Sequence, residues 1–261
     1  SKLNNARLIQ PTRRRFLAGA GAATLLLGGC DRLTQAPSFH DFLASAENLT
    51  RWLQRAVLPR EALAREFSPA DISPKFTANG TTDPDTPEYD VMLADSFTSW
   101  RLKIGGLVER PREYSLAELR ALPARTQITR HDCVEGWSCI GKWSGPQLGP
   151  ILATAGLKPN ARFAVFRCAD RLQAGIMRNQ YYESLDLIDA FHPQTILATD
   201  MNDQPLTVPY GAPLRLRVER QLGYKMAKYL MEIELVDSFV GIADGKGGFW
   251  EDLGYEWYAG I

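Results

Sequence analysis

The sequence is poor in the residue types from which metal and nucleic-acid sites are often built. Its 261 residues include 3 histidines, which argues against a histidine-rich metal site. Its 4 cysteines lack the paired Cys-x-x-Cys units of a zinc site. The 30 basic and 30 acidic residues give a formal net charge of zero. Without a basic surface field, we expect no nucleic-acid partner.

Long apolar runs are scarce as well. The weakly apolar run 18–29 is shorter than the roughly 20 residues that a membrane-spanning helix needs. It follows residues 12–17, whose two arginines, variable position and Phe-Leu pair fit a twin-arginine export signal. Residues 27–30 resemble a lipoprotein box, in which Cys30 would carry the lipid. A chance basic stretch, or signal cleavage without lipidation, is the alternative.

An export signal of this kind has chemical consequences. The twin-arginine machinery carries folded proteins, which suits a protein that receives its cofactor in the cytoplasm. We therefore expect a redox cofactor and a periplasmic mature protein, anchored to the membrane if Cys30 is lipidated. If Cys30 belongs to the signal, three cysteines remain, and at least one is unpaired within the chain.

The chain divides into three parts by composition. Residues 1–36 are the expected signal and tether, 37–99 an N-terminal helix followed by a loop, and 100–261 the core. Apolar residues at intervals of three and four predict the helix over 38–66. The loop over 69–87 is longer than a simple connector, and loops of that length are often functional.

The core pattern favours an α+β fold, because strands outnumber helices without strict alternation of the two. The 21 glycines and 16 prolines also indicate a turn-rich, strand-heavy body without internal repeats. Ser115 and Glu118 form a capping-box pattern at the start of one helix. The predicted strands are 100–104, 126–130, 162–168, 195–199, 213–218 and 231–236, and the predicted helices are 115–122, 147–156 and 184–191.

Cys133 is the most informative residue for chemistry. It follows the predicted strand 126–130 and lies among charged residues, with a glycine and a tryptophan after it. A thiolate in such a turn can ligate a metal or act as a nucleophile. Two alternatives stay open at this point: a disulfide with Cys139, and a nucleophile pair with His131, for which no further motif partner follows.

The segment Cys-Val-Glu-Gly-Trp at 133–137 resembles the molybdenum-ligating motif of sulfite-oxidase-fold enzymes. It is most similar to their bacterial branch of periplasmic methionine-sulfoxide reductase catalytic subunits. The resemblance extends in order over roughly residues 76–261, and it rests on seven blocks. After the first block, the others are 143–146, 182–185, 194–198, 211–216, 223–228 and 249–255.

This resemblance implies a sulfite-oxidase-type molybdopterin-binding domain with mixed β-sheets and short helices. It also implies a molybdenum–molybdopterin cofactor (Mo-MPT), with Cys133 as the single protein ligand of the metal and Glu135 beside it in the catalytic site. A thiolate suits a soft, redox-active metal. The implied cofactor-binding residues are Asn79, Thr82, Cys168, Tyr210, Arg215, Met226, Ala227 and Lys228.

Within that set the roles differ. Arg215 would face the cofactor phosphate, because a guanidinium recognises oxyanions with a planar fork of donors. The segment 226–228 would contact the same phosphate through backbone amides and the Lys228 ammonium. Asn79, and more loosely Thr82, align with an N-terminal pterin contact, which makes 69–87 a cofactor-contacting loop.

The sequence also departs from the family pattern. Tyr210 stands where the reductases have an asparagine, so either its phenol replaces that donor or the contact is lost. Cys168 stands where they have a threonine, so a backbone contact is expected at Cys168. The arginine-rich substrate pocket of sulfite oxidases is not recognisable around Cys133. Glu135 beside the metal disfavours an anionic substrate such as sulfite and favours a neutral sulfoxide or N-oxide.

The resemblance thus predicts oxygen-atom transfer that reduces a small sulfoxide- or N-oxide-type substrate. Because the sequence has no haem motif or iron–sulfur cysteines, electrons would come from a membrane b-type haem protein. We expect a monomer, since the chain has no room for a dimerisation domain. The alternatives are a sulfite-type dehydrogenase that runs oxidatively, and a metal-free, lipid-anchored binding protein.

Overall fold

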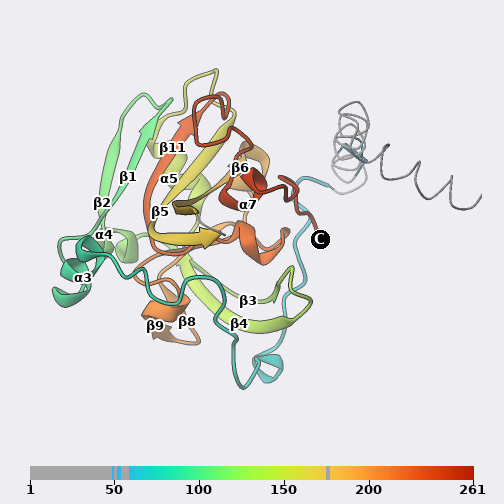
Figure 1. Ribbon diagram of the computed structural model, residues 1–261. Coiled ribbons are helices and arrows are strands. Elements are labelled where there is room, and N and C mark those ends of the chain that lie inside the picture. Colours follow the sequence, from blue (N-terminus) through green and yellow to red (C-terminus); the bar gives the residue numbers. More distant parts are fainter. Residues whose placement is uncertain (1–48, 50–51, 54–58, 175–176) are drawn as a thin grey trace, which may run out of the picture. The chain divides into compact units, whose positions relative to one another are not determined.

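A computed structural model describes residues 49, 52–53, 59–174 and 177–261 (Figure 1). The chain divides into two units, Ser1–Gln54 and Arg55–Ile261, and everything described below belongs to the second. The expected export signal, Cys30 and most of the expected helix 38–66 lie outside the described residues. Within the described part, no helix combines the length and apolar character required to cross a membrane.

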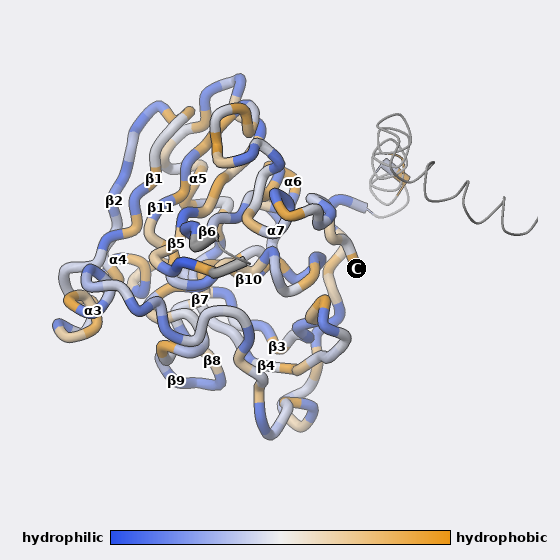
Figure 2. The backbone as a smooth tube through the Cα atoms, viewed as in Figure 1, coloured by the Kyte–Doolittle hydropathy of each residue, from blue (hydrophilic) through white to orange (hydrophobic). Residues whose placement is uncertain are grey.

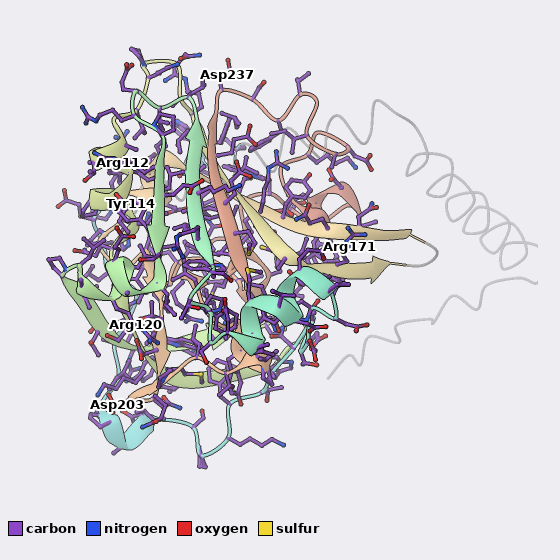
Figure 3. The ribbon with its side chains drawn as sticks, turned by 90° about the vertical axis from the view of Figure 1, so that its left-hand side faces the viewer. Arg112, Tyr114, Arg120, Arg171, Asp203 and Asp237 are labelled. Atoms are coloured by element: carbon purple, nitrogen blue, oxygen red, sulfur yellow. The ribbon has the colours of Figure 1, made fainter. Side chains whose placement is uncertain are left out.

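The main sheet has five strands in the order β2-β1-β11-β5-β6. They are β1 (Arg101–Gly106), β2 (Arg112–Ser115), β5 (Phe163–Ala174), β6 (Met177–Asp186) and β11 (Leu230–Val236). β1 pairs in parallel with β11, and the other neighbours are antiparallel, so the sheet is mixed. Figure 3 shows the two opposite edges of this sheet, with Arg112 and Tyr114 on the edge strand β2 and Arg171 on the β5–β6 hairpin.

Two smaller sheets complete the strand framework. One is four-stranded, in the order β3-β4-β8-β9, and the other pairs β10 with β7. The long hairpin of β3 and β4 runs in register from Ala124 opposite Pro146 to Asp132 opposite Ser138, so the turn 133–137 lies at its end. The strands are β3 (Ala124–Asp132), β4 (Ser138–Pro146), β7 (Ile196–Ala198), β8 (Asp200–Met201), β9 (Gln204–Pro205) and β10 (Arg215–Arg217).

The described helices are short and lie between the strands. Ser115 and Glu118 form the predicted capping box at the start of α4. In Figure 2 hydrophilic and hydrophobic segments alternate along the chain, as expected for strands and helices with one buried face. The α-helices are α3 (Pro87–Ala94), α4 (Leu116–Ala121), α5 (Leu148–Ala155), α6 (Leu187–Ala190) and α7 (Phe249–Asp252), and the 3-10 helices are η1 (Pro69–Asp71), η2 (Val208–Tyr210) and η3 (Gly223–Lys225).

Two apolar clusters hold the sheets together. The larger one lies on the main sheet and includes Trp100 and Phe166, both fully buried. The smaller one joins the β3–β4 hairpin to β7 through Phe76 and Trp143, whose rings meet edge-on at 5.3 Å. Because the second cluster contains Phe76, it fixes the loop 69–87 against the hairpin that carries Cys133.

The predicted α+β class is confirmed, and every predicted core strand is present within a few residues of its expected bounds. Two helix predictions need correction. Residues 59–66 are not helical, and Glu66 instead forms an isolated bridge with Thr129. Residues 184–186 belong to β6, because pairing with β5 across the core overrides their local helical pattern, and only α6 is helical.

Candidate functional site

A cavity of about 140 Å³ collects most of the predicted site residues. They come from four separate parts of the chain: the loop 69–87, the turn after β3, strand β10 and the segment after η3. The loop was predicted to be functional from its length and from the resemblance at Asn79, and its residues 79–81 line this cavity. The predicted residues among its lining are Asn79, Cys133, Glu135, Arg215, Met226 and Lys228.

Cys133 lies in a tight turn that aims its thiol into the cavity. The Cys133 amide donates to Trp137 O at 2.9 Å, and the Gly136 amide donates to Cys133 O at 3.0 Å. Gly136 has φ +88, which favours glycine. Asn79 Nδ2 donates to Cys133 Sγ at 3.3 Å. Burial raises the pKa of the Cys133 thiol, so a metal cation must displace its proton to bind the sulfur.

Glu135 is held beside this thiol. Trp137 Nε1 donates to Glu135 Oε2 at 2.9 Å, and the same oxygen is 3.8 Å from Cys133 Sγ. Val134 between them is 47% exposed, so the turn forms part of the cavity rim. The carboxyl group is therefore fixed next to the sulfur, at the entrance from solvent.

Two cations, the buried Arg215 and the half-buried Lys228, face the cavity. Lys228 Nζ donates to Asn79 O at 2.8 Å, to Pro209 O at 3.1 Å and to Thr81 O. Burial, and then Arg215, lower the pKa of Lys228 to about 7. Burial, and then Arg217, lower the pKa of Arg215 to about 9, and its Nε has no hydrogen-bond partner. Both cations would be stabilised by an anion in the cavity.

Asp170 is a cavity residue that the sequence reasoning missed. It lies on β5, its Oδ1 has no hydrogen-bond partner, and burial raises its pKa to about 6. An acid in the apolar strand 163–170 was the available signal, since such a residue is rarely buried without a role. The other missed lining residues are Gly80, Thr81, Val134, Leu172, Tyr181, Gly223, Tyr224, Trp250 and Tyr255.

Four predicted residues do not line the cavity. Thr82 is exposed, while its neighbour Thr81 lines the cavity. Ala227 is buried between the lining residues Met226 and Lys228. Cys168 is fully buried, and its carbonyl accepts from Gln180 Nε2 at 2.7 Å. Tyr210 donates to Phe76 O at 2.9 Å and lines a different cavity. Their cofactor contacts remain predictions.

Neither alternative for Cys133 agrees with the structure. Cys133, Cys139 and Cys168 are all free thiols, so the Cys133–Cys139 disulfide is wrong. His131 does not serve as a base for Cys133: its Nδ1 is 3.1 Å from Arg217 Nη1 and 3.2 Å from Met226 Sδ. Its Nε2 is packed against Gly223.

The donor set around the cavity fits a metal that brings most of its own ligands. Within the described ranges no group of three or more His, Cys, Asp and Glu side chains could hold a metal ion. Cys133 supplies one soft sulfur donor, and the unpartnered Nε of Arg215 supplies a donor for an oxyanion. A pterin dithiolene that carries a phosphate matches both features, because it supplies the remaining sulfur ligands and the anion.

A larger cavity, of about 400 Å³, lies along β5, β6 and α7. It has no cysteine among its lining residues, and its arginine, Arg167, is already paired with Glu234 at 2.5 Å. The smaller cavity is the better candidate for the site because its thiol and its unpaired cations face the same space.

Comparisons with known proteins agree with this geometry. A provisionally named protein-methionine-sulfoxide reductase subunit YedZ1 from Azospira oryzae is 35% identical over 96% of this chain and 88% of its own length. The protein-methionine-sulfoxide reductase catalytic subunit MsrP from Ralstonia nicotianae is 30% identical over 86% of this chain and 69% of its own.

Two further relatives match less of the chain. MsrP from Xanthomonas axonopodis is 35% identical over 66% of this chain and 52% of its own length, so the match spans about half of that protein. The crystal structure of the sulfane dehydrogenase SoxCD from Paracoccus pantotrophus is similar with a TM-score of 0.49 and 23% identity, over 56% of this chain and 40% of that one.

The model of the oxidoreductase molybdopterin-binding domain family matches residues 88–240, more than half of this chain. That range includes the Cys133 turn, Asp170, Arg215 and Lys228. The chain therefore belongs to the oxidoreductase molybdopterin-binding domain family, whose members are enzymes with a molybdenum–molybdopterin cofactor.

Proposed function

We propose that this protein reduces a sulfoxide- or N-oxide-type substrate by oxygen-atom transfer, with Cys133 as the protein ligand of molybdenum. The observation that carries this proposal is the position of the Cys133 thiol in one cavity with two cations, Arg215 and Lys228. When bound, the cofactor supplies two-electron oxygen-atom transfer, while the protein supplies ligation, orientation and access. The names of the relatives support a sulfoxide as the substrate.

The cofactor would be held at its two ends. Cys133 Sγ would bind the metal, and Asn79, whose amide donates to this sulfur at 3.3 Å, would stabilise the thiolate form. Arg215 and Lys228 would bind the phosphate, together with the backbone amide of Ala227, because the Met226 amide already donates to Gly223 O at 3.1 Å. Charge-assisted bonds of this kind are roughly twice as strong as neutral ones.

Glu135 would serve as the proton donor. Reduction of a sulfoxide consumes two protons and two electrons and yields a sulfide and water. Trp137 holds Glu135 Oε2 in place, 3.8 Å from Cys133 Sγ, so this carboxyl group could pass protons from the cavity entrance to a substrate beside the thiol. The two carboxyl groups of the cavity, Glu135 and Asp170, disfavour an anionic substrate such as sulfite.

The electron donor, the cellular location and the oligomeric state are proposed from the sequence and from the relatives. Relatives named as a subunit or a catalytic subunit support a separate electron-donating partner, for which we propose a membrane b-type haem protein. We propose export to the periplasm by the twin-arginine route, a lipid anchor at Cys30, and a monomeric catalytic chain. We also propose that Thr82, Cys168 and Tyr210 contact the pterin through the neighbouring backbone.

The proposal is tested with purified, cofactor-loaded protein. Reduced viologen as the electron donor should be oxidised when methionine sulfoxide is added, and sulfite should not reduce cytochrome c. Turnover with sulfite but with no sulfoxide or N-oxide would instead identify the dehydrogenase. Metal analysis of the native protein separates both from a metal-free binding protein, which would contain no molybdenum.

A further inference from the structure

Three charged side chains form a buried cluster behind the cavity wall. Glu183 lies on β6, Lys225 on η3 and Glu251 on α7. Lys225 Nζ is 2.5 Å from Glu183 Oε2 and also contacts Glu251 Oε1. The side chains are 0%, 0% and 1% exposed, so the cluster has no access to solvent. A buried cluster of this kind is costly unless its charges balance.

The charges balance only if the cluster holds a proton. Two carboxylates and one ammonium would leave one net negative charge in the interior. Glu183 Oε1 and Glu251 Oε2 also lack hydrogen-bond partners, although both carboxyl groups contact the same Lys225 Nζ. Burial, and then Glu251, raise the pKa of Glu183 well above its ordinary value. A proton on Glu183 supplies the missing donor and removes the excess charge.

The neighbouring titratable groups do not supply a compensating charge. Burial raises the pKa of Tyr181 on β6 and of Cys168 on β5, so both stay neutral. Burial also raises the pKa of Tyr182, whose hydroxyl donates to Asp252 of α7 at 2.5 Å. On η3, Lys225 itself faces the rings of Tyr224 and Trp257. Lys225 therefore neutralises one carboxylate of the cluster, and a bound proton neutralises the other.

Each member of the cluster lies within two residues of a cavity-lining residue. Lys225 lies between Tyr224 and Met226, Glu251 follows Trp250, and Glu183 is two residues after Tyr181 on β6. The cluster thus joins three elements of one wall. Lys225 is fully buried and does not line the cavity, whereas Lys228, three residues later, does.

We propose that Glu183, Lys225 and Glu251 form a proton-sharing clamp that positions the segment 226–228 and the Trp250 side of the cavity. The three are positioning residues, because they act through the wall and do not touch the cofactor. The inference rests on the proposed function only in assigning a cofactor to this cavity. In the motif 223–228, Lys228 is then the anion ligand and Lys225 the internal anchor.

The shared proton is tested on the full chain without its cofactor, so that the result does not depend on sulfoxide turnover. Because the pKa of Glu183 is raised in the folded state, protonation of Glu183 stabilises the folded chain fully below the ordinary glutamate pKa. This stabilisation is lost as the pH rises through the pKa of Glu183 in the folded state. The unfolding constant should therefore increase about tenfold per pH unit within that window.

Glu183→Gln should remove this dependence and should also remove the infrared band of a protonated carboxylic acid at neutral pH. Glu234→Gln is the matched control: it changes a carboxylate that pairs with Arg167 away from the cavity, and it should leave both readings unchanged. An unchanged pH slope and infrared band in Glu183→Gln would overturn the shared proton.

The positioning role is tested by the double variant Lys225→Met with Glu251→Gln. It removes the anchor but leaves a single carboxyl group that can stay protonated, so no buried charge is unpaired. We expect a folded chain that retains several-fold less molybdenum after gel filtration. Full molybdenum content together with an unchanged pH–rate profile would overturn the clamp. Absence of sulfoxide and N-oxide turnover would leave these stability and metal readings as expected, because neither depends on the substrate.

Discussion

The position and the protonation of the Cys133 thiol depend on several contacts. A turn closed by two backbone hydrogen bonds positions the sulfur, an amide from Asn79 stabilises its anion, and burial opposes that anion. The net effect is a thiol that stays protonated in the absence of metal. A metal cation would therefore release a proton as it binds.

Cys133→Ser should abolish molybdenum binding, because the cavity has no other thiol to replace this ligand. Activity should fall by more than the 10–100-fold that loss of a supporting residue typically costs. Metal analysis and viologen oxidation measure the two effects. Cys139→Ser is the matched control, since Cys139 is also buried but does not line the cavity, and it should retain both.

Lys228 makes anion binding dependent on pH. Its pKa of about 7 means that it is charged below this pH and neutral above it. The affinity of the cofactor-free chain for inorganic phosphate, measured by calorimetry, should therefore fall as the pH rises above 7, with uptake of a proton on binding. Lys228→Arg should remove the dependence. Lys142→Met, which alters a surface pair with Asp203, should leave it intact.

At the scale of elements, η3 packs tightly against β3 at Gly223. A Cβ at Gly223 would lie 2.4 Å from His131 Cε1 and Nε2, and His131 is two residues before Cys133. Because no side chain fits there, the cation-bearing segment after η3 stays close to the strand that leads to Cys133, the proposed metal ligand. The distance between thiol and cations depends on this contact.

Gly223→Ala should destabilise the protein by about 1–3 kcal/mol, the usual cost of overpacking, and should reduce cofactor retention. Urea unfolding and metal content measure these effects. Gly105→Ala provides the comparison, because a Cβ at Gly105 in β1 meets nothing within 4 Å. Equal stability of the two variants would mean that η3 moves away from His131 without penalty.

The whole chain separates into two units, and the site belongs to the second, Arg55–Ile261. The first residues of this unit are held by contacts with other residues of the same unit. For example, Gln194 Oε1 accepts from the Ala64 amide at 2.7 Å, and the Phe67 amide donates to Ile128 O at 2.8 Å. Catalysis and export are therefore expected to be separable.

A chain that starts at Arg55 should fold, bind molybdenum in the cytoplasm and reduce methionine sulfoxide with viologen at close to the full rate. It should not reach the periplasm, because residues 12–17 are removed. Fractionation and activity in each fraction measure the result. Loss of the molybdenum in the shortened chain would show that residues 1–54 contribute to the site.

Sequence reasoning succeeded where chemistry is local. The capping box at Ser115 and the alternating strand 231–236 each depend on residues only a few positions apart. It failed at 184–186, where pairing with β5 overrode a helical pattern, and at Asp170, whose role depends on burial. Burial depends on distant residues, so no local pattern reports it.

The strand and helix patterns were thus sufficient for the α+β class, and the family resemblance supplied the candidate ligand Cys133 and the anion-binding candidates Arg215 and Lys228, whose roles stay predictions. Folding was required to bring the loop 79–81 against Lys228 and to enclose Asp170. It also separated the two lysines of 223–228 into an anchor and a cavity residue. Such roles depend on distance and desolvation, which arise when segments far apart in the chain pack together.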